Sequence, residues 1–127
     1  MRSTLAAIVG VRRVLLLDSI TWLAEDDACH IVVSGSHGGR SAGDYATRWP
    51  LALCCLNDAG VGKDRAGILA LDMLASRGTP AIAYGHMSAR IGDAGDAWEH
   101  GIVTHVNGPA QALGFAPGQV LRDAIST

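Results

Sequence analysis

The chain has 127 residues, of which 49% are hydrophobic and 17% are charged, which fits one folded domain and excludes a disordered chain. The formal net charge of -2 gives no electrostatic basis for a nucleic acid or an acidic membrane as partner. No apolar run approaches the roughly 20 residues that a membrane-spanning helix needs. We therefore expect a single domain over residues 1–127, with no nucleic acid and no membrane among its partners.

The N-terminal third of the chain predicts strands and one short helix. Residues 5–17 contain two strand-like runs separated by Gly10, which is typical of one interrupted strand or of a hairpin. Residues 20–27 predict a short helix with Ser19 as its N-cap. A second strand is expected over residues 31–33.

The middle of the chain predicts a helical turn at residues 45–49, followed by a strand at residues 51–56. A helix is expected over residues 63–77, because apolar residues recur along it and Gly78 follows it. Its apolar arc is wide and the surface carries little charge. These two features favour a homo-oligomer in which this helix contacts a partner subunit.

The last part predicts a fourth strand at residues 81–84 and then a helix capped by Asp93. Four apolar residues fall at helical spacing along that helix: Trp98, Ile102, Val103 and Val106. Residues 117–125 are too short a segment to assign. Strands alternate with helices, which predicts an α/β fold, a three-layer Rossmann-like sandwich with a mostly parallel sheet.

Three cysteines are present, and they do not form a disulfide framework because their number is odd. Cys54 and Cys55 are adjacent, so on a strand they should point to opposite faces and should not bind one metal together. The N-terminal apolar run is short and ends at Arg12, without a secretory cleavage site. These features predict reduced, buried thiols in a cytoplasmic protein.

Two polar, glycine-rich loops follow predicted strands, and they are the main candidate for a functional site. The first spans residues 35–44 and the second spans residues 57–64. In an open parallel sheet, ligands bind outside the carboxyl ends of the strands. The two loops, and the loop at residues 85–92 after the fourth strand, should therefore meet at one edge of the sheet.

The candidate catalytic residues are His37, Asp58 and Asn57. His37 follows a strand among small residues, so its imidazole would be accessible as a general base or as an anion-binding imidazolium. Asp58 would orient His37, and Asn57 would donate to a developing oxyanion. The alternative is that His37 lies on the surface of a tight turn. In that case Asn57 and Asp58 only form a turn and cap the next helix.

The remaining candidates would bind the substrate. Arg90 would hold a carboxylate with two hydrogen bonds, unless it pairs locally with Asp93. Free N–H groups at the helix start near Lys63 would bind a small anion. The other substrate-binding candidates are Ser36, Gly38, Gly39, Arg40, Gly60, Gly62 and Ser88.

No cofactor or metal fingerprint is present. The second loop departs from the phosphate-binding pattern G-x-x-x-x-G-K-[ST] at Asn57 and Asp64, so we expect no nucleotide-hydrolysing loop. His100 and His105 are five residues apart on the predicted helix, and no acid or cysteine completes a metal set, so we expect no metal. Two further histidines have no assigned role: His30 and His86.

The turn at residues 36–38, with the strand and glycine that follow at residues 51–60, resembles the caspase-like cysteine peptidases. In that family a catalytic histidine lies in a Ser/Thr-His-Gly turn, and the catalytic cysteine follows the next strand. The resemblance covers residues 31–90 and implies a thiol hydrolase or an inactive relative of one.

The chain departs from this family at the nucleophile. The position expected for it, around Asp58 or Ala59, holds no cysteine. Cys54 and Cys55 lie earlier, inside the predicted strand, where a thiolate lacks an accessible, electropositive setting.

Together these features predict a small cofactor-independent enzyme of hydrolase or lyase/isomerase type. Its substrate would be a small polar metabolite, anionic or carbonyl-containing, bound at the C-terminal ends of the strands. Two alternatives stay open. One is a non-catalytic small-molecule-binding or regulatory subunit, and the other is the caspase-like thiol hydrolase or its inactive relative.

Overall fold

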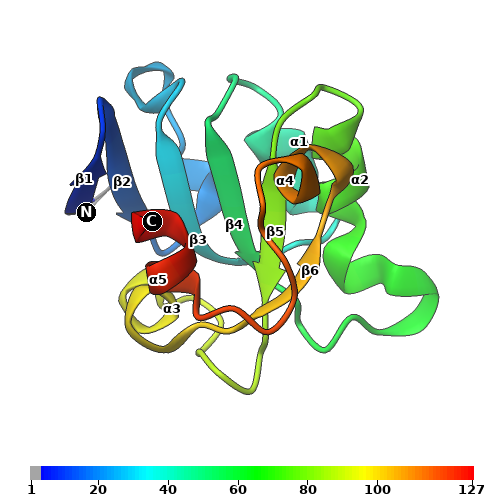
Figure 1. Cartoon of the computed structure of the whole chain (residues 1–127). Coiled ribbons are helices and arrows are strands. Elements are labelled where there is room, and N and C mark those ends of the chain that lie inside the picture. Colours follow the sequence, from blue (N-terminus) through cyan, green and yellow to red (C-terminus); the bar gives the residue numbers. More distant parts are fainter. Residues whose placement is uncertain (1–3) are drawn as a thin grey trace.

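The computed structural model describes residues 4–127 and has a mixed α/β fold built on one six-stranded sheet (Figure 1). The strands lie side by side in the order in which they follow one another along the chain. They are β1 (Thr4–Val9), β2 (Arg12–Leu17), β3 (Ile31–His37), β4 (Leu53–Asn57), β5 (Ala81–Tyr84) and β6 (Val103–Val106). The helices are α1 (Arg40–Ala46), α2 (Leu69–Ala75), α3 (Ala94–His100), α4 (Gly108–Ala112) and α5 (Leu121–Ser126). Three 3-10 segments complete the described elements: η1 (Ile20–Trp22), η2 (Glu25–Asp27) and η3 (Lys63–Ile68).

The sheet is mixed. β2, β3, β4 and β5 pair in parallel, whereas β1 pairs antiparallel with β2 and β6 pairs antiparallel with β5. The predicted parallel arrangement therefore holds for the central strands and not for the two edges. At the first edge the reason is local, because a turn at Gly10, with φ of 63°, joins β1 directly to β2 as a hairpin.

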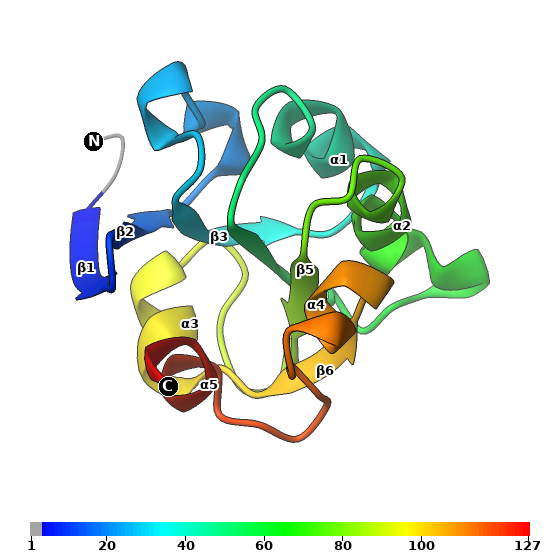
Figure 2. The ribbon, with the colours of Figure 1, turned by 45° about the horizontal axis from the view of Figure 1, so that its top comes forward.

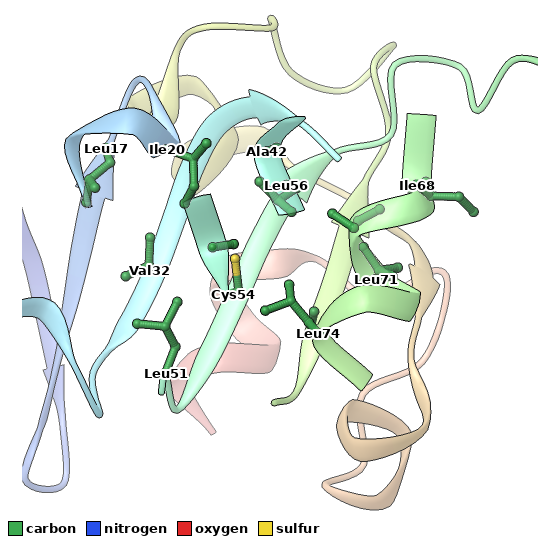
Figure 3. Packing of buried hydrophobic residues seen from close by; sticks show 14 of the residues in the cluster. Leu17, Ile20, Val32, Ala42, Leu51, Cys54, Leu56, Ile68, Leu71 and Leu74 are labelled. Carbon is green, nitrogen blue, oxygen red and sulfur yellow. The ribbon is translucent and has the colours of Figure 1, made fainter. Parts of the chain in front are cut away.

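Helices cover both faces of the sheet, as Figure 2 shows. α1, α2 and η1 pack on one face, where Leu74 of α2 is fully buried against Leu56 and Cys54 of β4 (Figure 3). α3, α4 and α5 pack on the other face, where Trp98 and Leu121 join Cys55. The two adjacent cysteines therefore point to opposite faces and are both fully buried, as the alternation of side chains along a strand predicts.

The predicted helices at residues 20–27 and 45–49 differ in detail from the structure. The first consists of two separate 3-10 turns, η1 and η2, although Ser19 does cap η1 by accepting from the Thr21 N–H at 3.3 Å. The second is α1, which begins at Arg40 directly after the extended Gly39 and ends at Ala46.

The helix predicted over residues 63–77 is wrong in its first half, since α2 begins only at Leu69. Asp64 and Arg65 have left-handed φ of 57° and 60°, which interrupts any regular helix. Gly67 then makes a close backbone approach to the preceding loop. A Cβ there would lie 2.5 Å from the Asp58 carbonyl oxygen, and its N–H donates to the Val61 carbonyl at 2.7 Å. The chain is folded tightly back beneath the preceding loop before the helix begins.

The helix predicted beyond Asp93 is also only partly right. Asp93 caps α3 by accepting from the Asp96 N–H at 2.9 Å, but α3 ends at His100. The residues that follow form β6 instead, where β-branched side chains pack well against β5. The spacing of apolar residues from Ile102 onward suits a helix and a strand alike, so pairing with β5 decided between them. Within residues 4–127, no helix has the length and apolar character needed to cross a membrane.

Candidate functional site

Three loops leave the sheet at the same side, where the parallel strands β3, β4 and β5 end, and this side is the edge that holds the candidate site. β3 ends at His37, β4 at Asn57 and β5 at Tyr84, and these three residues are aligned across the parallel strands. The loops after β4 and β5 leave the sheet at the tips of the arrows in Figure 1. The sequence prediction that these loops meet at one edge is therefore confirmed.

Asp58 is the centre of the hydrogen bonding at this edge. It follows β4 directly and is only 5% exposed. Its Oδ1 accepts from the Gly60 N–H at 2.8 Å and from the His86 N–H at 3.0 Å. Its Oδ2 accepts from the Thr104 hydroxyl at 2.9 Å. Burial by itself raises the pKa of Asp58, but these donors and the His86 ring outweigh it, so the pKa lies below its ordinary value.

His86 pairs with this carboxylate through its ring. Nδ1 of His86 lies 3.1 Å from Oδ1 of Asp58, while 47% of the His86 side chain remains exposed. An ionised carboxylate only accepts hydrogen bonds, so the proton between the two residues belongs to Nδ1. In the neutral imidazole Nε2 is then unprotonated and free to accept a proton. Gly60 lies against the ring, because a Cβ at Gly60 would be 3.4 Å from its Cε1.

β6 completes the network from the neighbouring strand. The Thr104 hydroxyl donates to Asp58 and lies 3.3 Å from the Ala83 carbonyl, a weaker contact. Because the single hydroxyl proton points to Asp58, the Thr104 oxygen can accept from Nδ1 of His105, 3.0 Å away. The antiparallel strand that the sequence did not predict therefore supplies one of the four hydrogen bonds to Asp58.

His37 does not make the contact expected of it. It is exposed at the end of β3, and its ring lies over Gly39, where a Cβ would be 2.9 Å from Nε2. Among residues 4–127, the His37 ring has no hydrogen-bond or ion-pair partner, and Asp58 pairs with His86 instead. The prediction that Asp58 orients His37 is therefore corrected to a pair with His86. His37 remains an accessible imidazole at the same edge.

Asn57 is fully buried, and both ends of its amide are already engaged. Its Nδ2 donates to the Ala89 carbonyl at 3.1 Å, and its Oδ1 accepts from the Ala59 N–H at 2.8 Å. These bonds tie the loop after β5 to the loop after β4. The amide therefore links the two loops, and it forms the turn of the structural alternative without capping the helix that follows.

The candidate serines are also used within the fold. Ser88 donates to the Gly85 carbonyl at 2.7 Å and accepts from the Ile102 N–H at 3.0 Å. Ser36 accepts from the Ile20 N–H at 2.9 Å. Neither hydroxyl lies within hydrogen-bond distance of His86, so neither is arranged as a nucleophile beside this base.

The glycines serve close approach and unusual backbone geometry. A Cβ at Gly38 would lie 2.9 Å from the Gly67 carbonyl oxygen, so the chain after β3 packs directly on η3. Gly60 and Gly62 have φ of 74° and 73°, and Val61 between them has φ of 67°, which a β-branched residue rarely adopts. The anion site predicted at a helix start near Lys63 is wrong in that form, because no regular helix begins there.

Four cationic side chains lie in these loops and the segments that follow them: Arg40, Lys63, Arg65 and Arg90. All four are exposed, and none forms an ion pair with another residue in the described part of the chain. The local Arg90–Asp93 pair is absent, because Asp93 caps α3 and the Arg90 N–H donates to Asp96 at 2.8 Å. The guanidinium of Arg90 therefore has no carboxylate partner at 4 Å or less among residues 4–127.

The thiols are not available at this edge. Cys54 and Cys55 are fully buried, and burial raises the pKa of Cys54 to about 12 and that of Cys55 well above its ordinary value. Cys29 is exposed but precedes β3, at the opposite edge of the sheet. A thiolate nucleophile beside His37 or His86 therefore has no candidate among these three cysteines.

The site is an open cluster of loops. A hollow of about 450 Å³ lies at the opposite ends of the strands, near Arg12, Leu53, Pro80 and Phe115, away from Asp58 and His86. No group of three or more His, Cys, Asp or Glu among residues 4–127 is placed to hold a metal ion. A small ligand near His86 would meet side chains and loop backbone.

Comparisons with family models, with curated proteins and with solved structures found no match to this chain. Its chemistry must therefore be inferred from the site itself.

Sequence reasoning missed His86 and Thr104 as members of this site. His86 carried a usable signal, because it follows a strand within two residues just as His37 ends one, whereas Thr104 lay in a segment predicted to be helical.

Proposed function

We propose that this chain is a small cofactor-independent enzyme of hydrolase or lyase/isomerase type, with His86 as its general base and Asp58 as the residue that orients it. One observation carries the proposal: a buried carboxylate accepts from Nδ1 of a half-exposed imidazole and from three further donors. A base of this kind is useful because the carboxylate fixes the tautomer and stabilises the imidazolium that forms.

The proposed reaction begins with proton transfer to Nε2 of His86. The proton comes either from a water molecule that attacks the substrate or from a carbon next to a carbonyl group. The buried Asp58 stays ionised, because its pKa is already below the ordinary value, and its charge stabilises the protonated ring. His37 is a second accessible imidazole at the same edge, and we assign it the complementary role of proton donor.

The proposed substrate is a small polar metabolite that carries a carboxylate. Arg40, Lys63 and Arg90 support this class, because they are exposed on the loops of this edge without an ion-pair partner among residues 4–127. A guanidinium is suited to hold a carboxylate through two parallel hydrogen bonds.

The proposal includes a three-layer, Rossmann-like classification, supported by the parallel β2–β5 core with helices on both faces. It also places the enzyme in the cytoplasm, in keeping with three free cysteines.

One alternative is favoured by a specific observation. Among the described residues, the Ser88 hydroxyl is used within the fold and Cys54 and Cys55 are buried, so none of them supplies a nucleophile beside His86, which suits a subunit that binds a small anion without turning it over. The thiol-hydrolase alternative gains no support, since Cys54 and Cys55 are fully buried.

The test is thermal unfolding of the wild type against a panel of small carboxylates, amides and carbonyl compounds. A ligand at 100 times its dissociation constant adds about 2.7 kcal/mol to the free energy of unfolding. We expect a hit that stabilises the wild type, is lost in His86→Ala and is retained in His100→Ala, whose ring lies on α3. The hit is then incubated in D2O and assayed for hydrolysis and for deuterium incorporation. Binding without turnover would select the binding subunit, and a hit unaffected by His86→Ala would overturn the proposed site.

A further inference from the structure

β1 forms an open edge of the sheet. It pairs with β2 on one side, and no other described residue makes a backbone hydrogen bond to its outer side. Figure 2 shows β1 at the margin of the molecule, with no other element beyond it. A row of unpaired N–H and C=O groups of this kind is a template for a further strand.

The opposite edge is treated differently. The outer side of β6 is hydrogen bonded by the segment that leads into α5, since the Val103 N–H donates to the Gln119 carbonyl at 2.9 Å. The Gly118 N–H in turn donates to the Val103 carbonyl at 2.8 Å, and Ile102 forms a bridge with Val120. The chain therefore pairs the start of β6 on its outer side, and no such pairing is present along β1.

The composition of β1 does not protect it. Its sequence, TLAAIV, contains no charged residue and no proline, the residues that commonly keep edge strands from pairing. The register between β1 and β2 shifts between Leu5 and Ala7. Because of this shift, Leu5 lies opposite Leu15 of β2, and Ile8 lies opposite Arg13. Leu15 and Arg13 are two residues apart, so Leu5 and Ile8 lie on the same face of the sheet. There they are 53% and 66% exposed.

We propose that β1 pairs antiparallel with β1 of a second copy of this chain, about a two-fold axis perpendicular to the sheet. The register centred between Ala6 and Ala7 pairs Leu5 with Ile8 of the partner subunit, and the symmetry repeats that pair. The two sheets then become one continuous sheet, and four exposed apolar side chains form one strip on a single face.

A second copy fits this edge because an antiparallel strand is complementary to itself. Each outward N–H of one β1 can donate to an outward C=O of the other, and the two-fold symmetry repeats every such bond in the reverse direction. No charge of either strand is buried, because β1 has none. The interface is separate from Asp58 and His86, since β1 lies three strands away from β4. It therefore does not depend on the proposed function.

The first test is the mass in solution, measured by light scattering up to about 100 µM. We expect the wild type at twice the monomer mass of 13.2 kDa and Ile8→Lys at the monomer mass, because the lysine would face Leu5 of the partner subunit. Val11→Lys is the matched control. Val11 is 92% exposed at the hairpin turn and lies outside β1, so this variant should stay dimeric. A monomeric wild type, or a dimeric Ile8→Lys variant, would overturn the proposal.

The second test reads the register without relying on a disruptive substitution. Leu5→Cys and Ile8→Cys are made as separate proteins in a Cys29→Ser background, because Cys29 is the exposed cysteine. A short bis-maleimide should cross-link the mixture of the two and leave each protein alone largely unlinked, since only the mixture places the two thiols opposite one another. Equal cross-linking in all three samples, or none in the mixture, would exclude this pairing.

Discussion

The imidazole of His86 lies 3.1 Å from the carboxylate of Asp58, although the two residues are 28 positions apart in the chain. Parallel pairing of β4 with β5 brings them together, since Asp58 follows one strand and His86 follows its neighbour. The Asp58 side chain also accepts from two backbone N–H groups and one hydroxyl, so the pair is held by the fold around it. These contacts make several measurable properties depend on Asp58.

Stability should depend on pH through Asp58. Its pKa in the folded protein is below its ordinary value, so its contribution is present above the unfolded pKa of about 3.9 and is lost as the pH falls toward the folded pKa. We expect the free energy of unfolding in urea to fall in that acidic window. Asp58→Asn should be less stable than the wild type at pH 7, and the difference should narrow in acid. The exposed Asp44→Asn is the control, and an unchanged difference between Asp58→Asn and wild type at all pH values would contradict the assignment.

Thr104 should matter through its hydroxyl. Thr104→Val keeps the shape of the side chain but leaves Oδ2 of the buried Asp58 without its hydroxyl donor. We expect a loss of about 1–3 kcal/mol in the free energy of unfolding and a higher pKa for Asp58, followed by carboxyl carbon NMR. Thr104→Ser keeps the hydroxyl and should restore the pKa of Asp58. A Thr104→Val protein with an unchanged Asp58 titration would show that the hydroxyl does not act on this carboxylate.

Gly67 should not tolerate a side chain. A Cβ would lie 2.5 Å from the Asp58 carbonyl oxygen and 2.9 Å from the Val61 carbonyl oxygen, so the backbone of the second loop must move. We expect Gly67→Ala to lower the midpoint of thermal unfolding and to shift the His86 ring signals in NMR spectra.

Gly108→Ala is the matched control for this change. A Cβ at Gly108 meets nothing within 4 Å, and Gly108 lies at the start of α4, where alanine favours the helix. Equal midpoints for the two variants would contradict the close approach of Gly67 to the loop.

The three thiols should differ in reactivity. A mild thiol reagent such as a disulfide of nitrobenzoate should modify Cys29 in the folded protein, while Cys54 and Cys55 should react only after unfolding. The measurement is the number of thiols titrated at pH 8 without and with denaturant, with Cys29→Ser as the control. Rapid reaction of Cys54 or Cys55 in the native state would revive the thiol-hydrolase alternative.

Much of the fold was predictable because local patterns determine it. The strand Ala81–Tyr84 and the cap at Asp93 follow from short-range spacing and turn chemistry. The sequence left residues 5–17 open between one interrupted strand and a hairpin, and the structure has the hairpin. The loop predicted at residues 57–64 is close to the observed one, which lies between the end of β4 at Asn57 and the start of η3 at Lys63. The loop predicted at residues 35–44 is wrong in most of its length, because β3 continues to His37 and α1 begins at Arg40.

The Asp58–His86 pairing was less predictable because it depends on which strands are neighbours. His37 and His86 both lie at the ends of strands, and nothing in their local sequence says which of them Asp58 will meet. Thr104 was hidden by a second ambiguity, since the apolar residues around it suit a helix as well as a strand. Only the antiparallel addition of β6 beside β5 brings its hydroxyl to Asp58.

The sequence by itself determined the α/β class, the buried position of Cys54 and Cys55 on opposite faces, and the edge at which the polar loops gather. These properties follow from the alternation of side chains and from the conformations that glycine allows, which act within a few residues. The tertiary structure decided that His86, and not His37, is the partner of Asp58, and that β1 is left open while the start of β6 is paired on its outer side. Contacts of this kind join residues far apart in the chain, and their geometry exists only once the strands have paired.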